Sequence, residues 1–91
     1  MVTSREPLAR DQVREELARL IGEIVGVPRE RITDSATVED DLRMESVAFV
    51  EMQVAIEEAY NIQIDPIHVL ELNEFGAIVD YIYACAVDGT G

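Results

Sequence analysis

Apolar side chains recur at helical spacing near the start of the chain. The positions are Val13, Leu17, Leu20, Ile21, Ile24 and Val25. Steps of three and four residues are typical of an amphipathic helix that buries one face. Asp11 is the expected N-cap of this helix, and Gly26 followed by Pro28 ends it.

Two more helices follow in the middle of the chain. The second is expected from about Ser46 to Tyr60, with Asn61 as its terminator. Asp65-Pro66 then has the form of an N-cap followed by proline at the first helical position. This dipeptide predicts a short third helix over about Ile67 to Leu70.

A fourth helix completes the pattern. Asn73 is its expected N-cap, and its buried stripe is expected to contain Phe75, Ile78, Ile82 and Cys85. Cys85 is the chain's single cysteine and fits a buried structural thiol. The sequence thus predicts an all-α four-helix bundle with three longer helices. We expect the bundle to span residues 11–87, between a flexible N-terminal segment, 1–10, and a flexible tail, 88–91.

The connection between the first two helices, Val27 to Glu45, is unusually long. Only Ile32, Val38 and Leu42 within it are expected to anchor to a core. Connections of this length are uncommon in compact domains and are often functional.

The second helix carries apolar residues on two nearly opposite faces when its positions are set about 100° apart. One face, which suits a core, holds Phe49, Met52, Ile56, Ala59 and Tyr60. The other holds Val47, Val50 and Val54 together with Glu51 and Glu58. Either the long connection covers this second face, or the face is exposed and binds another protein. The carboxylates favour exposure, because a covered face would have to bury them.

The charge of the chain narrows its possible partners. Nineteen acidic residues oppose seven basic ones, giving a net charge of −12. Such a surface repels nucleic acid and anionic membranes, and it favours partner proteins with basic patches. Acidity that serves only solubility is the alternative.

The sequence also lacks several common signals. The N-terminus has no signal-peptide pattern, no apolar run is long enough to span a membrane, and no residues have metal-ligand spacing. We expect a cytoplasmic monomer.

Ser46 lies at the start of the second helix, after an acidic segment. A serine in this position often serves only as an N-cap. A helix N-terminus also favours a bonded phosphate, because its free N–H groups and its dipole point toward it. No catalytic residues are predicted, since the single histidine, His68, lies far from Ser46 in sequence and suits a surface or capping role.

The run Asp41-Leu42-Arg43-Met44-Glu45-Ser46-Val47 resembles the Asp-Leu-Gly-x-Asp-Ser-Leu signature of the acyl carrier protein family. The following helix and the segment Ile78–Ile82 are also similar to that family, and the resemblance covers about Val13 to Ala86. It implies an acyl-carrier four-helix bundle that performs no catalysis. It also implies that Ser46 bears 4′-phosphopantetheine, transferred from coenzyme A by a phosphopantetheinyl transferase.

The resemblance further implies that the second helix docks on partner enzymes. The recognition residues it indicates are Arg43, Glu45, Val47, Val50, Glu51, Val54 and Glu58. The partners it implies, besides the transferase, are acyltransferases, ketosynthases or adenylating and ligase enzymes with basic docking patches.

Four residues depart from the pattern of fatty-acid carriers. Arg43 replaces the usual glycine, Glu45 the aspartate and Val47 the leucine, and Ala48 stands where another acidic residue is usual. These departures favour a carrier of polyketide or mixed polyketide and nonribosomal biosynthesis. An aminoacyl or peptidyl carrier and an unmodified acidic interaction module are the alternatives.

Overall fold

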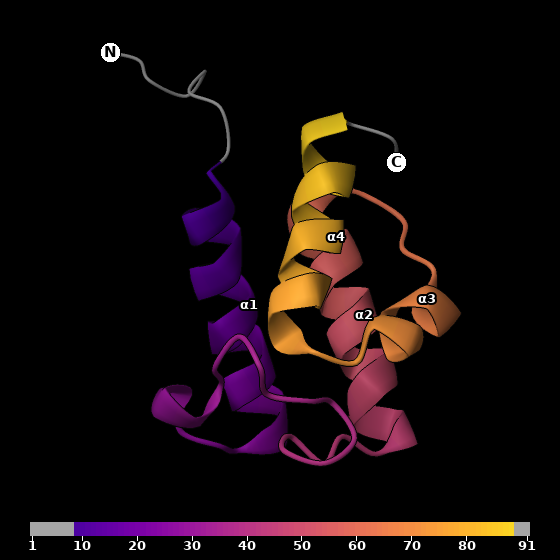
Figure 1. Cartoon of the computed structure of the whole chain (residues 1–91). Helices are drawn as coiled ribbons and strands as arrows, with labels where there is room; N and C mark the ends of the chain where they lie inside the picture. Colours follow the sequence, from indigo (N-terminus) through magenta and orange to yellow (C-terminus); the bar gives the residue numbers. More distant parts are fainter. Residues whose placement is uncertain (1–8, 89–91) are drawn as a thin grey trace.

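The computed structural model describes residues 9–88 and contains four α-helices in this range. The bounds are Arg10–Val25 for α1, Ser46–Tyr60 for α2, Pro66–Leu72 for α3 and Phe75–Asp88 for α4. Figure 1 shows α1 running antiparallel to both α2 and α4, with the short α3 to one side. Helix α1 contacts α2 and α4, and α3 contacts α4. The predicted all-α four-helix bundle is confirmed.

The core is formed by one face of each helix together with anchors from the connections. Its fully buried large side chains are Val13, Leu17, Ile21, Ile32, Val38, Met52, Ile56, Val69, Phe75, Ile78, Val79 and Ile82. The predicted anchors of the long connection, Ile32, Val38 and Leu42, are all buried, and Ala36 is a fourth that was not predicted. Leu20, Ile24 and Val25 of α1 are only half-buried.

The long connection is ordered by backbone bonds to the start of α4 (Figure 1). It also contains a short 3-10 helix, Arg29–Arg31 (η2), which the sequence did not predict. The N–H groups of Phe75 and Gly76 donate to the carbonyl oxygens of Ala36 and Asp34, both at 2.8 Å. The N–H of Val38 donates to the carbonyl oxygen of Asn73, also at 2.8 Å. The connection therefore stabilises the N-terminus of α4.

These bonds explain why the prediction of Asn73 as the N-cap of α4 is wrong. Asn73 is the C-cap of α3, with φ of 65°, and its N–H donates to the carbonyl oxygen of Val69. The donors at the start of α4 find backbone carbonyls of the long connection, so no side-chain cap is needed there.

The start of α1 also differs from the prediction. Asp11 lies inside the first turn, and Ala9 is the N-cap residue. The side chain of Gln12 accepts a hydrogen bond from the N–H of Ala9 at 3.0 Å, so the cap lies two residues before Asp11 and the helix begins at Arg10. The other end agrees with the prediction, because Gly26 adopts φ of 74° and ends the helix.

The remaining helix ends mostly confirm their signals. Asn61 ends α2 in the left-handed conformation, with φ of 55°. The carboxylate of Asp65 caps α3 by accepting from the N–H groups of Ile67 at 3.0 Å and His68 at 3.4 Å. Cys85 is half-buried at the edge of the core, because the fully buried stripe of α4 ends at Ile82.

The flexible segments predicted at 1–10 and 88–91 lie mostly outside the described residues. Ala9, Arg10 and Asp88 are the exceptions: Ala9 is the N-cap residue of α1, and Arg10 and Asp88 belong to helices. None of the described helices combines the length and apolar character needed to cross a membrane.

Candidate functional site

The second apolar face of α2 is open to solvent. Val47, Val50 and Val54 are 70%, 54% and 46% exposed. Glu51 and Glu58 are exposed as well. The long connection therefore does not cover this face, so the first of the two alternatives left by the sequence is wrong.

The opposite face of α2 enters the core largely as predicted. Phe49, Met52 and Ile56 are buried, and Tyr60 is half-buried. Ala59 is exposed, so its assignment to the core is wrong. It lies near the C-terminal end of α2, where it borders a shallow surface depression with Gln12 and Glu16 of α1.

Ser46 is the first residue of α2 and not its cap. Glu45 is the N-cap residue, with extended backbone angles, and its carbonyl oxygen accepts from the N–H of Phe49 at 2.8 Å. The Ser46 side chain is exposed. None of the side-chain hydrogen bonds found within residues 9–88 uses its hydroxyl. The capping role considered for Ser46 is therefore wrong, and its hydroxyl is exposed.

A compact turn holds the segment before Ser46 in place. The carboxylate of Asp41 accepts from the N–H of Thr37 at 2.9 Å and from its hydroxyl at 3.2 Å. The Thr37 hydroxyl in turn accepts from the N–H groups of Asp40 and Asp41, both at 3.2 Å. Leu42 is buried beneath this turn. These hydrogen bonds and the burial of Leu42 hold the segment that leads into α2 in one position.

Arg43 completes the turn in the left-handed conformation, with φ of 52°. Glycine adopts such a backbone without strain, whereas arginine does so at some cost. Its side chain is exposed, as are those of Asp40, Asp41 and Glu45. The charged residues of the segment from Asp40 to Glu45 are therefore acidic except for this guanidinium.

The start of α2 fits a phosphodiester. Helix bonding begins with the N–H of Phe49, so the N–H groups of Ser46, Val47 and Ala48 precede the first intrahelical donor. These donors and the positive end of the helix dipole favour a negative group on the Ser46 hydroxyl.

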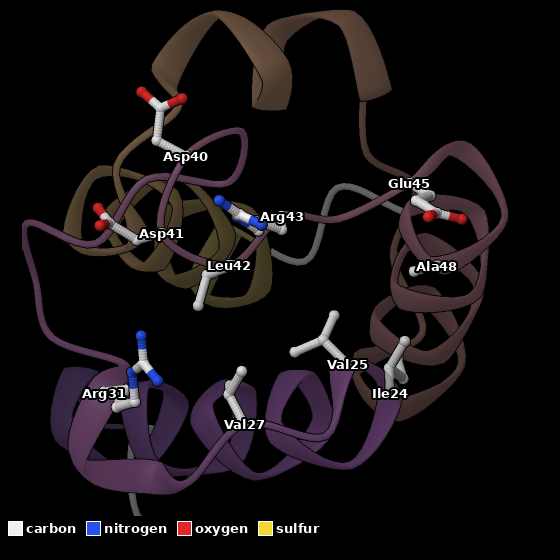
Figure 2. Close-up of a pocket in the computed structure, with 10 residues that line it drawn as sticks. All are labelled: Ile24, Val25, Val27, Arg31, Asp40, Asp41, Leu42, Arg43, Glu45 and Ala48. Carbon is white, nitrogen blue, oxygen red and sulfur yellow. The ribbon is translucent and has the colours of Figure 1, made fainter.

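An open depression of about 650 Å³ lies at the start of α2, where Glu45 and Ala48 line it, and its lining was not predicted from the sequence (Figure 2). It lies between the end of α1, the long connection and the start of α2. Its lining residues are Ile24, Val25, Val27, Arg31, Asp40, Asp41, Leu42, Arg43, Glu45 and Ala48. A smaller, apolar depression of about 290 Å³ is lined by Ser46, Val47, Val50 and Glu51.

Two exposed apolar residues of α3 were also missed. Ile67 is 67% and Leu70 is 41% exposed, whereas Val69 is fully buried. Their spacing of three residues puts Ile67 and Leu70 on one face of the helix, which was the only available signal.

The single histidine, His68, lies on α3. The ring of His68 packs edge-on against Tyr81, with centroids 4.8 Å apart, and its Nδ1 lies 3.9 Å from a Glu71 carboxylate oxygen. Its neighbours are thus on α3 and α4. A serine nucleophile needs a base within hydrogen-bond reach. Within the described residues, no group of three or more potential ligands is arranged to hold a metal.

Comparisons with known proteins agree with this arrangement. Residues 15–82 match the family model described as "Phosphopantetheine attachment site". A curated relative, the acyl carrier protein of Acidothermus cellulolyticus, is 33% identical over 75 residues, which cover 82% of this chain and 89% of the relative.

A solved structure shows the same fold. It is an acyl carrier protein from Enterococcus faecalis, with a TM-score of 0.72 and 24% identity. The match covers 86% of this chain and 99% of that structure. Together with the family match, the curated relative leads to one conclusion: the chain belongs to the acyl carrier protein family, whose members are non-catalytic carriers with a 4′-phosphopantetheine prosthetic group.

Proposed function

We propose that Ser46 is the residue that bears the phosphopantetheine arm. The observation that carries this proposal is its exposed, uncommitted hydroxyl on the first residue of α2. The arm's terminal thiol would carry the acyl group as a thioester. The protein's own part is to hold the attachment point in a fixed place and to expose it to enzymes.

The exposed face of α2 is proposed as the docking surface for those enzymes. The proposed surface comprises Val47, Val50, Glu51, Val54 and Glu58 of α2, together with Arg43 and Glu45 just before the helix. The three valines offer apolar contact next to the attachment point. Carboxylates around them complement basic patches and accelerate encounter. A small patch of this kind suits a complex that must form and separate repeatedly.

Attachment of the acyl group to the arm explains how the carrier would deliver it to an enzyme. Once the carrier docks, the arm presents its cargo at an effective concentration that free diffusion does not reach. The expected partners are a phosphopantetheinyl transferase and then acyltransferases, ketosynthases or adenylating and ligase enzymes with basic docking patches. Monomeric state and cytoplasmic location stay predictions from the sequence.

A role in polyketide-type biosynthesis is proposed from the residues around Ser46. Arg43 introduces a positive charge and Ala48 removes a negative one relative to the fatty-acid pattern. Both changes alter the charge that a partner meets at the arm. An aminoacyl or peptidyl carrier of a nonribosomal pathway is the second candidate. The match to an attachment-site family disfavours an unmodified interaction module.

The cargo distinguishes these roles. The protein should be isolated from its native host, and the acyl group released from its arm should be weighed by mass spectrometry. We expect a β-keto, β-hydroxy or other short acyl group. An amino acid on the arm would support the nonribosomal role, and saturated chains of graded length would overturn the specialised role in favour of fatty-acid synthesis.

A further inference from the structure

The arginines of the described chain divide into two groups. The first group forms ion pairs with carboxylates and consists of Arg10, Arg14, Arg19 and Arg29. Arg31 and Arg43 form no ion pair with any carboxylate of residues 9–88, and both side chains are exposed. The charge and the N–H donors of these two guanidinium groups are therefore not used within this range.

The backbone of Arg43 adds a second observation. Its φ of 52° lies in the left-handed region, which glycine adopts without strain and arginine adopts at a cost. The N–H of the next residue, Met44, donates to the carbonyl oxygen of Val38 at 3.1 Å, so backbone bonds hold this turn. No ion pair of the arginine side chain offsets the cost inside the described part of the chain. Residues in such conformations cluster at binding sites.

Arg31 and Arg43 line the same depression, between the end of α1, the long connection and the start of α2 (Figure 2). One side of this depression is apolar, because Ile24, Val25 and Val27 line it and are only half-buried. Figure 2 shows Val25 and Val27 pointing into the space. The depression therefore offers apolar contact next to two guanidinium groups.

This depression adjoins the docking surface proposed for α2. Arg43 and Glu45 belong to both, and Ser46 directly follows Glu45 in the sequence. An enzyme that docks around Ser46 therefore meets the carboxylates of α2 and the two guanidinium groups in one continuous contact.

We propose that the depression receives an acidic side chain of the acyl-loading enzyme, presented next to an apolar residue of that enzyme. The enzyme's carboxylate binds Arg31 and Arg43, and its apolar residue packs on the valine side of the depression. The proposal rests on the proposed function, because it needs an enzyme that acts on an arm at Ser46. It adds a contact of opposite sign to the basic patches expected against α2.

Charge complementarity supports this choice of partner. The net charge of −12 repels a carboxylate of the enzyme over most of the surface, whereas the depression offers two guanidinium groups. Guanidinium groups bind carboxylates well because their N–H donors match the two oxygens. A basic patch alone can meet so acidic a surface in several orientations. One contact of opposite sign selects a single orientation of the enzyme over the arm.

The carboxylates of the depression define the alternative occupant. Asp40, Asp41 and Glu45 also line it, and none of them forms an ion pair with either guanidinium group. The Asp41 carboxylate instead accepts two hydrogen bonds from Thr37. A basic side chain of the enzyme would bind these carboxylates. The two occupants predict opposite effects when an arginine of the depression is replaced by glutamate.

The test reverses charge in the protein that bears the arm and measures acyl loading. The arm is installed on each variant with coenzyme A and a phosphopantetheinyl transferase, and intact mass checks this step. The probe is the enzyme purified from the native host by its ability to acylate this arm. Arg31→Glu and Arg43→Glu should each lower kcat/KM for loading about fivefold, mainly through KM. Arg19→Glu makes the same change in net charge outside the depression and should not lower kcat/KM.

A fourth variant separates the contact from folding. Circular dichroism should show that both glutamate variants fold as the parent does, because both side chains are exposed. Arg43→Gly suits the left-handed backbone and removes the guanidinium without adding a negative charge. It should therefore also lower kcat/KM, by less than Arg43→Glu does. Unchanged loading of Arg43→Gly would overturn the proposal even if a glutamate variant does not fold.

A reciprocal change tests the enzyme's side of the contact. Carboxylates near the entrance to the enzyme's active site are replaced by lysine, one at a time. One replacement should restore loading of Arg43→Glu and lower loading of the parent. The proposal is overturned if no replacement does so.

Other outcomes also contradict the proposal. A raised kcat/KM in Arg31→Glu and Arg43→Glu would mean that a basic side chain occupies the depression. An equal loss in Arg19→Glu would show that only the net charge of the protein matters. If the intact mass shows no arm, the proposed function fails before loading is measured, whereas an installed arm with unchanged kcat/KM in the variants overturns this inference alone.

Discussion

The backbone N–H of Gly76 donates a hydrogen bond of 2.8 Å to the carbonyl oxygen of Asp34, where the long connection meets the start of α4. The approach is so close that a Cβ atom at residue 76 would lie 3.1 Å from the Cβ of Asp34 and 3.2 Å from its carbonyl oxygen. A side chain at residue 76 would therefore be tightly placed, and Asp34 would have to move by a few tenths of an ångström to make room for it. The same contact helps hold the connection that positions Ser46.

Gly76→Ala should destabilise the fold. The added methyl group must displace the backbone of residue 34, and overpacking of this kind costs about 1–3 kcal/mol. Thermal or urea unfolding measures the loss. Without a steric conflict, alanine should stabilise the helix relative to glycine. An unchanged or raised unfolding midpoint would therefore contradict the close contact with Asp34.

Acid should weaken the ion pair that anchors the same connection. The side chain of Arg14 donates to the carboxylate of Asp34 at 2.7 Å, and this hydrogen bond lowers the pKa of Asp34 below its ordinary value of 3.8. Because the folded-state pKa is the lower one, the pair stabilises the fold fully above the unfolded value. This contribution is lost as the pH falls through the folded value.

The comparison of parent and Arg14→Gln by urea unfolding, from about pH 6 to about pH 2.5, tests this linkage. The stability difference should shrink on acidification. The part of the difference that comes from Arg14 stacking over the Phe75 ring, 5.4 Å from its centroid, should persist. If the stability difference between parent and variant stays constant across this pH range, the ion pair of Arg14 with Asp34 does not contribute to stability.

Val54→Asp should weaken docking and leave the fold intact. Val54 is half-exposed on the valine face, so its replacement should change the free energy of unfolding by about 0.5 kcal/mol or less. Ile56→Asp, two residues further on, is the matched contrast, since Ile56 is fully buried and a carboxylate there should unfold the domain. Circular dichroism and binding to an acyl-loading enzyme measure the two effects. Unfolding of the Val54 variant would show that this face is covered.

Charge reversal at Glu51 and Glu58 should slow association with an acyl-loading enzyme. Both carboxylates are exposed, and the steering they provide is screened by salt. The variant should therefore also show a weaker dependence of the association rate on salt. Asp11→Lys with Glu30→Lys has the same net charge and changes α1 and η2 instead. Equal association rates for the two double variants would show that only the net charge of the protein matters, and not the position of Glu51 and Glu58.

Much of the fold follows from local chemistry. Gly26, Asn61 and Asp65 end or begin helices through their own backbone preferences or side-chain bonds, so the sequence predicts them. The two faces of α2 follow from helical spacing, which correctly separates Phe49 from Val50. The place of Ser46 at the start of α2 was predicted, but the capping role considered for it is wrong, because Glu45 is the N-cap residue.

The remaining features depend on partners distant in the chain. Asn73 resembles an N-cap, but the donors of α4 bond to Ala36 and Asp34, about forty residues earlier. Arg31 and Arg43 meet at one depression only after the long connection folds. Local propensity and spacing do not contain such contacts, so the sequence alone does not predict them.

The intact mass of the purified protein, after incubation with coenzyme A and a phosphopantetheinyl transferase, tests the central claim most directly. The parent should gain one phosphopantetheine mass and Ser46→Ala should gain none. Ser35→Ala, which removes an exposed serine of the long connection, should be modified like the parent. An unmodified parent with several active transferases, or a modified Ser46→Ala variant, would contradict the assignment of the arm to Ser46.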